Sequence, residues 1–244
     1  ENYRMVGNPD LERTLVDNFD FRWEWYPKGG ELVSISGFYK DFTNPIELRD
    51  VEEAANTEIH IENIEKAKLY GLELEFRKKM DFISVLDDFS VGTNLTLVHS
   101  IVNEDSTKLS SANIAMENAN PEGNDTWPET RPMYGQSPYI VNAYINYYNR
   151  DNGFDANLGF NIAGEKIVLI NKAAIPHVME QPFARLDFNI SKQFESGISI
   201  KFSAENLLNP YKAQIQTFSN GEVIHFRQHK LGRKFSLGVT YRID

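Results

Sequence analysis

The chain has 244 residues, no cysteine and a formal net charge of -10, from 25 Lys and Arg against 35 Asp and Glu. The lack of cysteine excludes a disulfide framework, thiolate metal sites and a cysteine nucleophile. The negative charge argues against a nucleic-acid partner and against adhesion to an anionic membrane surface. No apolar run approaches the roughly 18 residues of a membrane-spanning helix, but transmembrane strands alternate and leave no such run.

The first predicted element is a hairpin. At about residues 15–26, aromatic side chains recur at every second position from Phe19 to Trp25, with polar residues between them. Successive side chains of a strand point to opposite faces, so this alternation predicts a strand. Pro27–Gly30 predicts a tight turn, and a second strand follows at about 31–42. A long polar connection, about 44–63, leads to the next element.

Two further strands are predicted at about 64–78 and 89–102, joined by a moderate link at about 80–88. The longest irregular segment of the sequence follows, at about 103–135, and is rich in Asn, Ser, Glu and Pro. A loop of this length inside a compact domain is uncommon unless the loop has a function. Its last part, with several aromatic and charged residues, is therefore the first place to look for a binding site.

Five more strands are predicted at about 138–148, 154–162, 183–194, 198–205 and 231–241. The turns Asn149–Gly153 and Glu195–Gly197 are short, as in hairpins. The connections at about 165–182 and 206–230 are long, and the second is expected to hold its own hairpin at Ser219–Glu222. The period-2 criterion thus predicts about nine strands, with no convincing helix.

The lengths of the connections alternate along the chain. In an up-and-down antiparallel meander, this alternation places every short turn at one end of the strands and every long loop at the other. Outer-membrane barrels have this arrangement, with short periplasmic turns and long extracellular loops. We therefore predict an all-β, antiparallel, up-and-down transmembrane β-barrel in which these strands form one part.

The two faces of the predicted strands differ in the same sense. One face is apolar and is fringed by aromatic residues, which gather at membrane interfaces. The other carries many charges, which a small barrel filled by its own side chains could hardly satisfy but a wide lumen could. These charged residues are Asp20, Arg22, Glu24, Glu73, Glu75, Arg77, Asp187, Lys201, Glu205 and Lys234.

A soluble β-sandwich with one solvated face is the alternative, and it would act as a binding protein. It shares the alternation, which is common to antiparallel sheets. It explains poorly the regular sequence of short and long connections and the aromatic fringe.

Six stretches form a recognisable set in this order along the chain: Asn8-Pro9-Asp10-Leu11, Glu24-Trp25-Tyr26-Pro27, Ile35-Ser36-Gly37-Phe38-Tyr39, Tyr70-Gly71-Leu72-Glu73, Gly135-Gln136-Ser137-Pro138-Tyr139 and Glu205-Asn206-Leu207-Leu208-Asn209-Pro210-Tyr211. Together they resemble the C-terminal half of TonB-dependent outer-membrane receptors. The end of the chain differs, because that family often ends on an aromatic residue and this sequence ends Tyr241-Arg242-Ile243-Asp244.

The resemblance implies a barrel of about 22 strands, located in the bacterial outer membrane and preceded by a plug and a TonB box. A sheet of about nine strands has two unpaired edges, which lipid does not tolerate. We therefore interpret residues 1–244 as the C-terminal portion of the barrel, with the plug and the first strands outside this sequence. The strand at about 231–241 is expected to be the seam, paired on one side with the strand at about 198–205.

The function implied by the resemblance is uptake of a scarce nutrient, such as a siderophore, vitamin, glycan or peptide, with energy from TonB. The implied partners are TonB, the nutrient ligand, outer-membrane lipid and a surface lipoprotein over the loops. No cofactor, metal or catalytic residue is implied. An adhesin or a signalling receptor without active transport remains the alternative within outer-membrane barrels.

The residues favoured for ligand contact are Trp127, Arg131 and Tyr134 in the longest loop and His177 in another. An aromatic ring near an arginine suits sugars and anionic chelates. The competing interpretation is that these side chains only pack the loops against the barrel mouth.

An enzyme is the remaining alternative. Glu73 and Glu75 lie two apart on one predicted strand face, about 7 Å apart, a separation compatible with glycosidic chemistry. Solvated lumen charges explain the same pair more simply. His225 and His229 have no helix to align them as metal ligands, and the acidic residues of the longest loop lack an EF-hand pattern.

Overall fold

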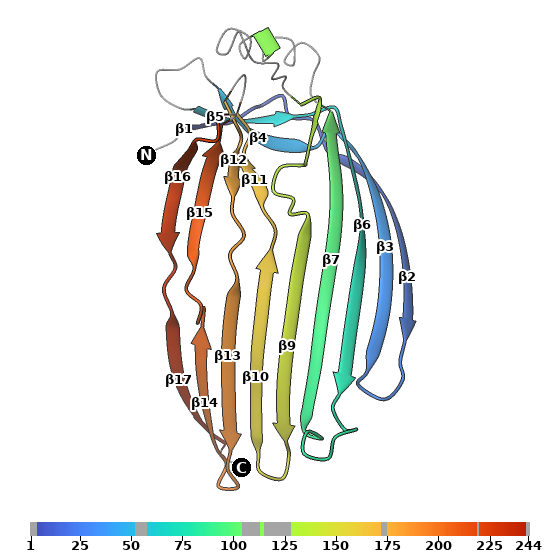
Figure 1. The fold of residues 1–244 in the computed structure, drawn as a ribbon, viewed down its shortest axis with the longest axis vertical. Helices are drawn as coiled ribbons and strands as arrows, with labels where there is room; N and C mark the ends of the chain where they lie inside the picture. The colour runs from blue at the N-terminus through green and yellow to red at the C-terminus, as the bar shows by residue number, and fades with distance from the viewer. Residues whose placement is uncertain are drawn as a thin grey trace.

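The computed structural model describes residues 4–51, 58–103, 113–114, 128–171, 175–218 and 220–242. Nine strands of a ten-stranded antiparallel sheet lie side by side in the order β17-β14-β13-β10-β9-β7-β6-β3-β2 (Figure 1), and the tenth, β8 (Thr130–Arg131), pairs with the end of β7. Their bounds are β2 (Leu15–Trp25), β3 (Leu32–Thr43), β6 (Lys66–Lys79), β7 (Phe89–Asn103), β9 (Tyr139–Asn149), β10 (Phe154–Ala163), β13 (Arg185–Gln193), β14 (Ile198–Glu205) and β17 (Lys234–Tyr241). The nine predicted strands and their up-and-down order are confirmed. Among the described residues, no helix is long and apolar enough to cross a membrane.

The register places the apolar residues of neighbouring strands in continuous rows. One such row runs through six strands: Trp23, Ile35, Leu74, Leu95, Val141 and Ile162. A polar row lies on the other face: Glu24, Ser34, Glu75, Asn94, Asn142, Asn161 and Arg185. Directly opposed residues of antiparallel strands share a face, so the whole sheet has one apolar and one polar side.

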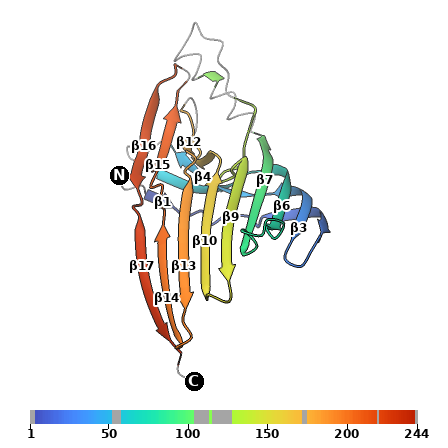
Figure 2. The ribbon, with the colours of Figure 1, turned by 60° about the horizontal axis from the view of Figure 1, so that its bottom comes forward.

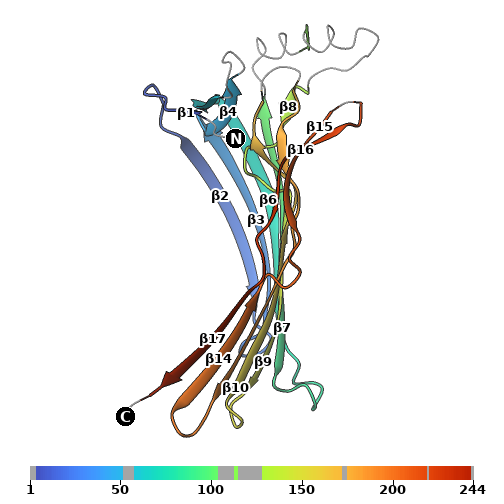
Figure 3. The same ribbon diagram turned by 90° about the vertical axis from the view of Figure 1, so that its left-hand side faces the viewer.

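The sheet is curved (Figure 3). Burial indicates that its polar side is the concave one. Ala67 and Val102 are buried in a cluster with Ile64, under the elements that fold onto the concave side. Ala67 lies on the same face of β6 as Glu73 and Glu75, because strand side chains alternate. The convex side instead exposes large apolar residues such as Phe21 and Leu237, each 71% exposed. An apolar convex face and a polar concave face are the pattern of a membrane barrel.

The short turns lie together at one end of the sheet, and the long connections lie at the other (Figure 1). The four connections Pro27–Gly30, Met80–Asp88, Asn149–Gly153 and Glu195–Gly197 join the strands at the first end. This arrangement confirms the predicted alternation. In a barrel of this type, the end with the short turns is periplasmic and the other is extracellular.

Two of the long connections contain more strand than predicted. The segment at about 165–182 was expected to be irregular, but it holds a hairpin that prolongs β10 and β13 upward. The four-stranded sheet of this region consists of β11 (Lys166–Leu169), β12 (Val178–Glu180), β15 (Tyr211–Thr217) and β16 (Val223–Lys230). The β15–β16 hairpin confirms the one predicted at Ser219–Glu222. The prediction for 165–182 was wrong because short strands interrupted by a β-bulge show little alternation.

A three-stranded sheet folds onto the concave side at the extracellular end. It consists of β1 (Arg4–Val6), β4 (Ile46–Val51) and β5 (Glu58–Asn63), with β1 parallel to β5. We call these strands the strap. Figures 2 and 3 show β1 and β4 on the side of the sheet toward which its edges curve. The prediction of an irregular connection at about 44–63 was therefore also wrong.

Candidate functional site

The strap bends away from the wall at Asn44, which has a positive φ of 55°. Asn tolerates this left-handed backbone better than most residues. The backbone bonds continue through the bend, because Asn44 N donates to Glu65 O (3.0 Å) and Ile64 N donates to Pro45 O (2.9 Å). Strands β4 and β5 of the strap are thus the end of the β3–β6 hairpin folded inward, and their direction is set at Asn44.

The strap reaches across the concave face to the opposite part of the wall. Arg49 of β4 forms a parallel bridge with Ile170, and Ile170 N donates to Leu48 O at 3.4 Å. Ile170 directly follows β11, which prolongs β10, and four strands of the sheet separate β10 from β2. The strap is therefore a chord across the curved sheet.

A buried ion pair holds the strap to the end of the longest loop. Arg131 Nη1 and Nη2 donate to Glu47 Oε1 (3.0 Å) and Oε2 (2.5 Å), and both side chains are at most 3% exposed. Arg49 Nη2 lies 3.7 Å from Glu47 Oε2. A bidentate pair of this kind fixes geometry as well as charge. Glu47 thereby joins two arginines from segments that are far apart in the sequence.

Tyr134 follows this pair and is half-buried. Its backbone N donates to Glu47 Oε1 at 3.4 Å. Burial raises the pKa of the Tyr134 hydroxyl, and the negative charge of Glu47 raises it further. The phenol is therefore protonated at neutral pH and can both donate and accept a hydrogen bond.

His177 lies in the turn between β11 and β12 and is also half-buried. Its Nδ1 accepts a hydrogen bond from Asn171 N at 3.2 Å. The turn is braced by Pro176 O, which accepts from Asn171 Nδ2 (2.7 Å) and Gln216 Nε2 (3.0 Å). Because Asn171 follows Ile170, this turn adjoins the same strand β4 that Arg131 contacts through Glu47.

The structure therefore places three of the four predicted contact residues around one element. Arg131 and Tyr134 meet β4 through Glu47, and His177 belongs to the turn that β4 reaches at Ile170. Trp127 lies outside the described residues. Arg131 is 5% exposed, so in this conformation its side chain cross-links the protein. Ligand contact by any of the four stays a prediction.

Glu47 and Arg49 were missed by the sequence reasoning. The signal that could have found them is the alternation in Ile46-Glu47-Leu48-Arg49, which is typical of a strand with charges on one face. In the structure this alternation is inverted relative to a soluble strand, since Glu47 is 2% exposed and Ile46 is 46% exposed.

The concave wall below the strap is lined by paired charges and amides. Arg22 bonds to Glu24 (2.6 Å) and Glu75 (3.0 Å), and Arg77 Nε lies 3.1 Å from Glu75. Glu75 thus lies between two guanidinium groups, as expected for a charge that faces the lumen. The described residues contain no group of three or more side chains suited to hold a metal ion.

Amide side chains form two cross-strand hydrogen bonds farther along the concave wall. Asn161 Nδ2 donates to Asn142 Oδ1 at 2.7 Å, and Asn157 Nδ2 donates to Asn146 Oδ1 at 2.6 Å. This part of the wall is polar without net charge. A water-filled or protein-filled lumen can accommodate such a surface, and lipid cannot.

Comparison with known proteins identifies one family. The family described as "TonB dependent receptor-like, beta-barrel" matches residues 1–207. A search among curated proteins found no match.

Solved structures have the same fold at low sequence identity. The ferric enterobactin receptor PfeA from Pseudomonas aeruginosa has a TM-score of 0.58 and 15% identity over 97% of this chain and 32% of its own. The ferric yersiniabactin uptake receptor FyuA from Yersinia pestis has 0.58 and 13%, over 93% and 29%. The FrpB iron transporter from Neisseria meningitidis has 0.57 and 14%, over 98% and 32%. The chain therefore spans about a third of the length of these proteins.

Proposed function

Because the chain belongs to the TonB-dependent receptor family, as part of its β-barrel, we propose that its protein takes up a scarce nutrient with energy from TonB. The barrels of this family lie in the bacterial outer membrane, and the family consists of receptors and transporters, not enzymes. The observation that carries the proposal is the match of the family over residues 1–207. The apolar convex face and the polar concave face support it.

Within this proposal, the nutrient binds above the strap at the extracellular mouth. Tyr134 and His177 are half-buried beside the strap and present groups that donate and accept hydrogen bonds. Trp127, seven residues before Tyr134 in the sequence, supplies an aromatic ring from the same loop. Arg131 acts as a positioning residue, because its bonds to Glu47 hold the backbone that carries Tyr134.

The proposed substrate class is a metal chelate or another nutrient too large or too scarce for passive entry. The similar proteins are a ferric enterobactin receptor, a ferric yersiniabactin uptake receptor and an iron transporter. At 13–15% identity these likenesses indicate the fold alone. Glycans, vitamins and peptides therefore remain candidate nutrients. We propose a surface lipoprotein over the loops as a further partner.

The test is uptake by cells that express the full-length receptor in a strain without its own receptors. The probes are ⁵⁵Fe-labelled enterobactin, ⁵⁵Fe-labelled yersiniabactin, cyanocobalamin and maltoheptaose. We expect one probe to accumulate against its gradient and to stop accumulating when a protonophore collapses the proton gradient. If no probe accumulates above the receptor-free strain, or if the protonophore has no effect, active uptake of these nutrient classes is wrong and an adhesin or signalling role takes its place.

The contact residues are tested with the probe that accumulates. Tyr134→Ala, His177→Ala and Trp127→Ala are each expected to weaken binding about tenfold, which corresponds to about 1.4 kcal/mol. Tyr148→Ala is the matched control, because Tyr148 lies at the periplasmic end and is 58% exposed. Unchanged affinity in all three variants would remove these residues from the site.

A further inference from the structure

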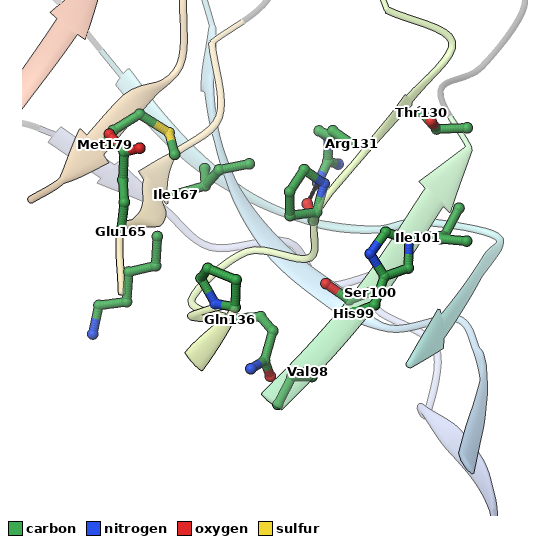
Figure 4. A pocket seen from close by; sticks show the side chains of 13 residues that line it. Val98, His99, Ser100, Ile101, Thr130, Arg131, Gln136, Glu165, Ile167 and Met179 are labelled. Carbon is green, nitrogen blue, oxygen red and sulfur yellow. Dashed lines mark hydrogen bonds between the residues drawn. The ribbon is translucent and has the colours of Figure 1, made fainter. Parts of the chain in front are cut away.

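The wall of the sheet is interrupted between β7 and β11 at the extracellular end. β9 begins at Tyr139, opposite Leu97, while β7 continues to Asn103 and pairs with β8 (Thr130–Arg131) at Val102 and Asn103. A hollow of about 300 Å³ occupies this interruption and is lined from one side by β7 and from the other by Ile167 and Met179. Figure 4 shows His99 and Ser100 on β7, with Gln136, Ile167 and Met179 around the same hollow. We call this hollow the wall site.

The wall site is closed toward the lumen. Met133 N donates to Ser100 Oγ at 3.0 Å, and Gly135 N donates to Ile167 O at 2.9 Å. The segment from Met133 to Gly135 therefore runs from β7 to β11 on the lumen side of the hollow. Met133 also packs against the buried cluster on the concave side, which places this segment on the lumen side of the wall.

The wall site is continuous with a second hollow on the convex face. The two share Val98, His99 and Pro138. The second hollow, of about 420 Å³, is also lined by Tyr70, Leu72 and Leu97. The register places Leu72 and Leu97 in one outward row with Phe21 and Tyr139. The wall site therefore opens toward lipid.

The opening lies at the extracellular boundary of the apolar band. Tyr70 is in a row with Phe19 and Tyr39, and its ring lies 5.2 Å from that of His99. Aromatic rows of this kind mark the interface between hydrocarbon and headgroups. A hollow at this depth is within reach of an acyl chain that enters from the side.

Two lysines on the outward side lie next to the opening. Lys166, which lines the wall site, lies 3.3 Å from Glu180, and Lys212 lies 3.1 Å from the same carboxylate. Glu165 also lines the wall site, so the two lysines are balanced by two carboxylates, and the net charge depends on the next cation along the sheet. The row that contains Glu180 continues through Gln214 to Arg227, which adds another cation.

The surroundings of Gly164, Lys166 and Lys212 indicate that the two lysines point outward. A Cβ at Gly164 would lie 2.9 Å from the ring of Tyr139, which belongs to the outward row. Lys166, at the start of β11, is partly exposed, whereas the next residue, Ile167, points the opposite way and is 2% exposed. Lys212 lies 5.5 Å above the ring of Phe183, as expected for a lysine whose stem lies along apolar surface and whose charge faces the headgroups.

We propose that the wall site binds one acyl chain of a phosphorylated membrane lipid, whose phosphate is held by Lys166 and Lys212. The apolar opening fits the chain, and the net positive charge fits a phosphate at headgroup depth. The phosphate would compete with Glu180 for the two ammonium groups. This site is on the outer surface and does not depend on which nutrient the receptor takes up.

The test is native mass spectrometry of the full-length receptor in detergent. Two phosphorylated probes, hexa-acylated lipid A and palmitoyl-oleoyl phosphatidylglycerol, are titrated separately. Diacylglycerol, which lacks a phosphate, is the third probe and is expected to bind more weakly than either. Lipid A alone as ligand assigns the site to a glycolipid, and equal binding of both assigns it to the phosphate and acyl chain that they share.

Variants distinguish the wall site from general lipid adhesion. Ile101→Trp fills the hollow from β7, and Met179→Trp fills it from the opposite side. Each is expected to lower lipid retention at least about tenfold, whereas Leu95→Trp, on the outward face of the same strand, should not. Lys166→Gln and Lys212→Gln are each expected to lower lipid retention about fivefold. Lys212→Arg keeps the positive charge and should bind lipid as the wild type does. Lys192→Gln is the matched control, because Lys192 lies 4.3 Å above the Phe154 ring at the periplasmic boundary.

Folding of every variant is checked by its mobility on a gel with and without heating, and only folded variants are compared. The proposal is overturned if neither phosphorylated probe binds the wild-type receptor. It is also overturned if the folded variants of the wall site and of its two lysines retain lipid as the wild type does. The same holds if the controls Leu95→Trp and Lys192→Gln lose as much lipid as those variants.

Discussion

At the scale of single residues, Glu47 is the most connected side chain of the candidate site. It is 2% exposed and bonds to Arg131, Arg49 and the backbone of Tyr134. Removing one partner of a buried pair leaves an uncompensated charge, which costs about 3–5 kcal/mol. The two ends of this interaction differ, because Glu47 lies between two arginines, Arg131 and Arg49.

We predict that Glu47→Ala destabilises the receptor by about 3 kcal/mol or more and that Arg131→Ala destabilises it less. Glu47→Ala removes the bidentate carboxylate from Arg131 and one carboxylate from Arg49, which keeps Glu62 at 4.0 Å, whereas Arg131→Ala leaves Glu47 beside Arg49. The measurement is the temperature at which gel mobility changes on heating. Lys28→Ala is the control, because the exposed Lys28–Asp81 pair should contribute at most about 1 kcal/mol. Equal losses for Glu47→Ala and Lys28→Ala would contradict the prediction.

Glu180 lies outside the apolar band, and its shifted pKa predicts that the stability of the fold depends on pH. Burial acts to raise the pKa of Glu180, but hydrogen bonds and attraction from Lys212 and Lys166 outweigh it and hold that pKa below its usual value of 4.5. A carboxylate whose folded pKa is depressed stabilises the fold above the unfolded pKa. This contribution is lost as the pH falls through the lower, folded pKa.

We therefore expect the midpoint of thermal unfolding to fall as the pH is lowered below 4.5, and to fall less in Glu180→Gln, which cannot titrate. The measurement is a set of unfolding curves from pH 6 down to about pH 3. Identical pH profiles for the wild type and Glu180→Gln would show that Glu180 does not contribute.

At the scale of elements, the short periplasmic turns depend on glycine. Gly153 closes the β9–β10 turn with a φ of +63°, and a Cβ there would lie 2.3 Å from Gln193 O. Gly221, in the β15–β16 turn, also has a positive φ, +81°, but a Cβ there would meet nothing within 4 Å. Substitutions at these two glycines therefore distinguish the cost of backbone strain from the cost of steric overlap.

We predict that Gly221→Ala costs about 1–2 kcal/mol from backbone strain alone. Gly153→Ala adds the displacement of the neighbouring β13 backbone, which raises the cost by about 1 kcal/mol or more. Urea unfolding of the receptor in detergent measures both. A Gly153→Ala variant as stable as Gly221→Ala would mean that β13 moves aside without cost.

The strap shows how an element can escape sequence analysis. Its strands are six residues or fewer, and the connection between β4 and β5 separates them. The period-2 criterion needs a longer run to be decisive, so this region was predicted to be irregular. Its position against β11 depends on the bend at Asn44 and on a contact with Ile170, more than a hundred residues away.

At the scale of the whole molecule, the described sheet is open. β2 and β17 form its edges, and each has one strand partner among the described residues. The expected pairing of the last strand with β14 is confirmed, with Ile198 opposite Tyr241. The convex face between these edges is apolar, and lipid does not tolerate unpaired strand edges. The sheet must therefore be completed by further strands when it lies in a membrane.

We predict that the 244-residue chain, refolded alone in detergent, does not form a compact barrel with heat-dependent gel mobility. The full-length receptor, treated identically, should show that mobility shift. A single monomeric band that changes position only on boiling, obtained from the 244-residue chain, would show that β2 and β17 can pair with each other.

The sequence by itself determined the nine long strands, their faces and the ends at which they turn. These properties are local, because alternation along a strand and the residues of a tight turn are set by neighbours in the chain. It also pointed to Arg131, Tyr134 and His177 as residues of the extracellular end. The tertiary structure alone showed that Glu47 binds Arg131 across 84 positions of sequence, that the strap crosses the concave face, and that a hollow opens in the wall beside Lys166. These features form where segments that are far apart in the sequence come into contact. The alternation of residues along the chain does not indicate which segments those are.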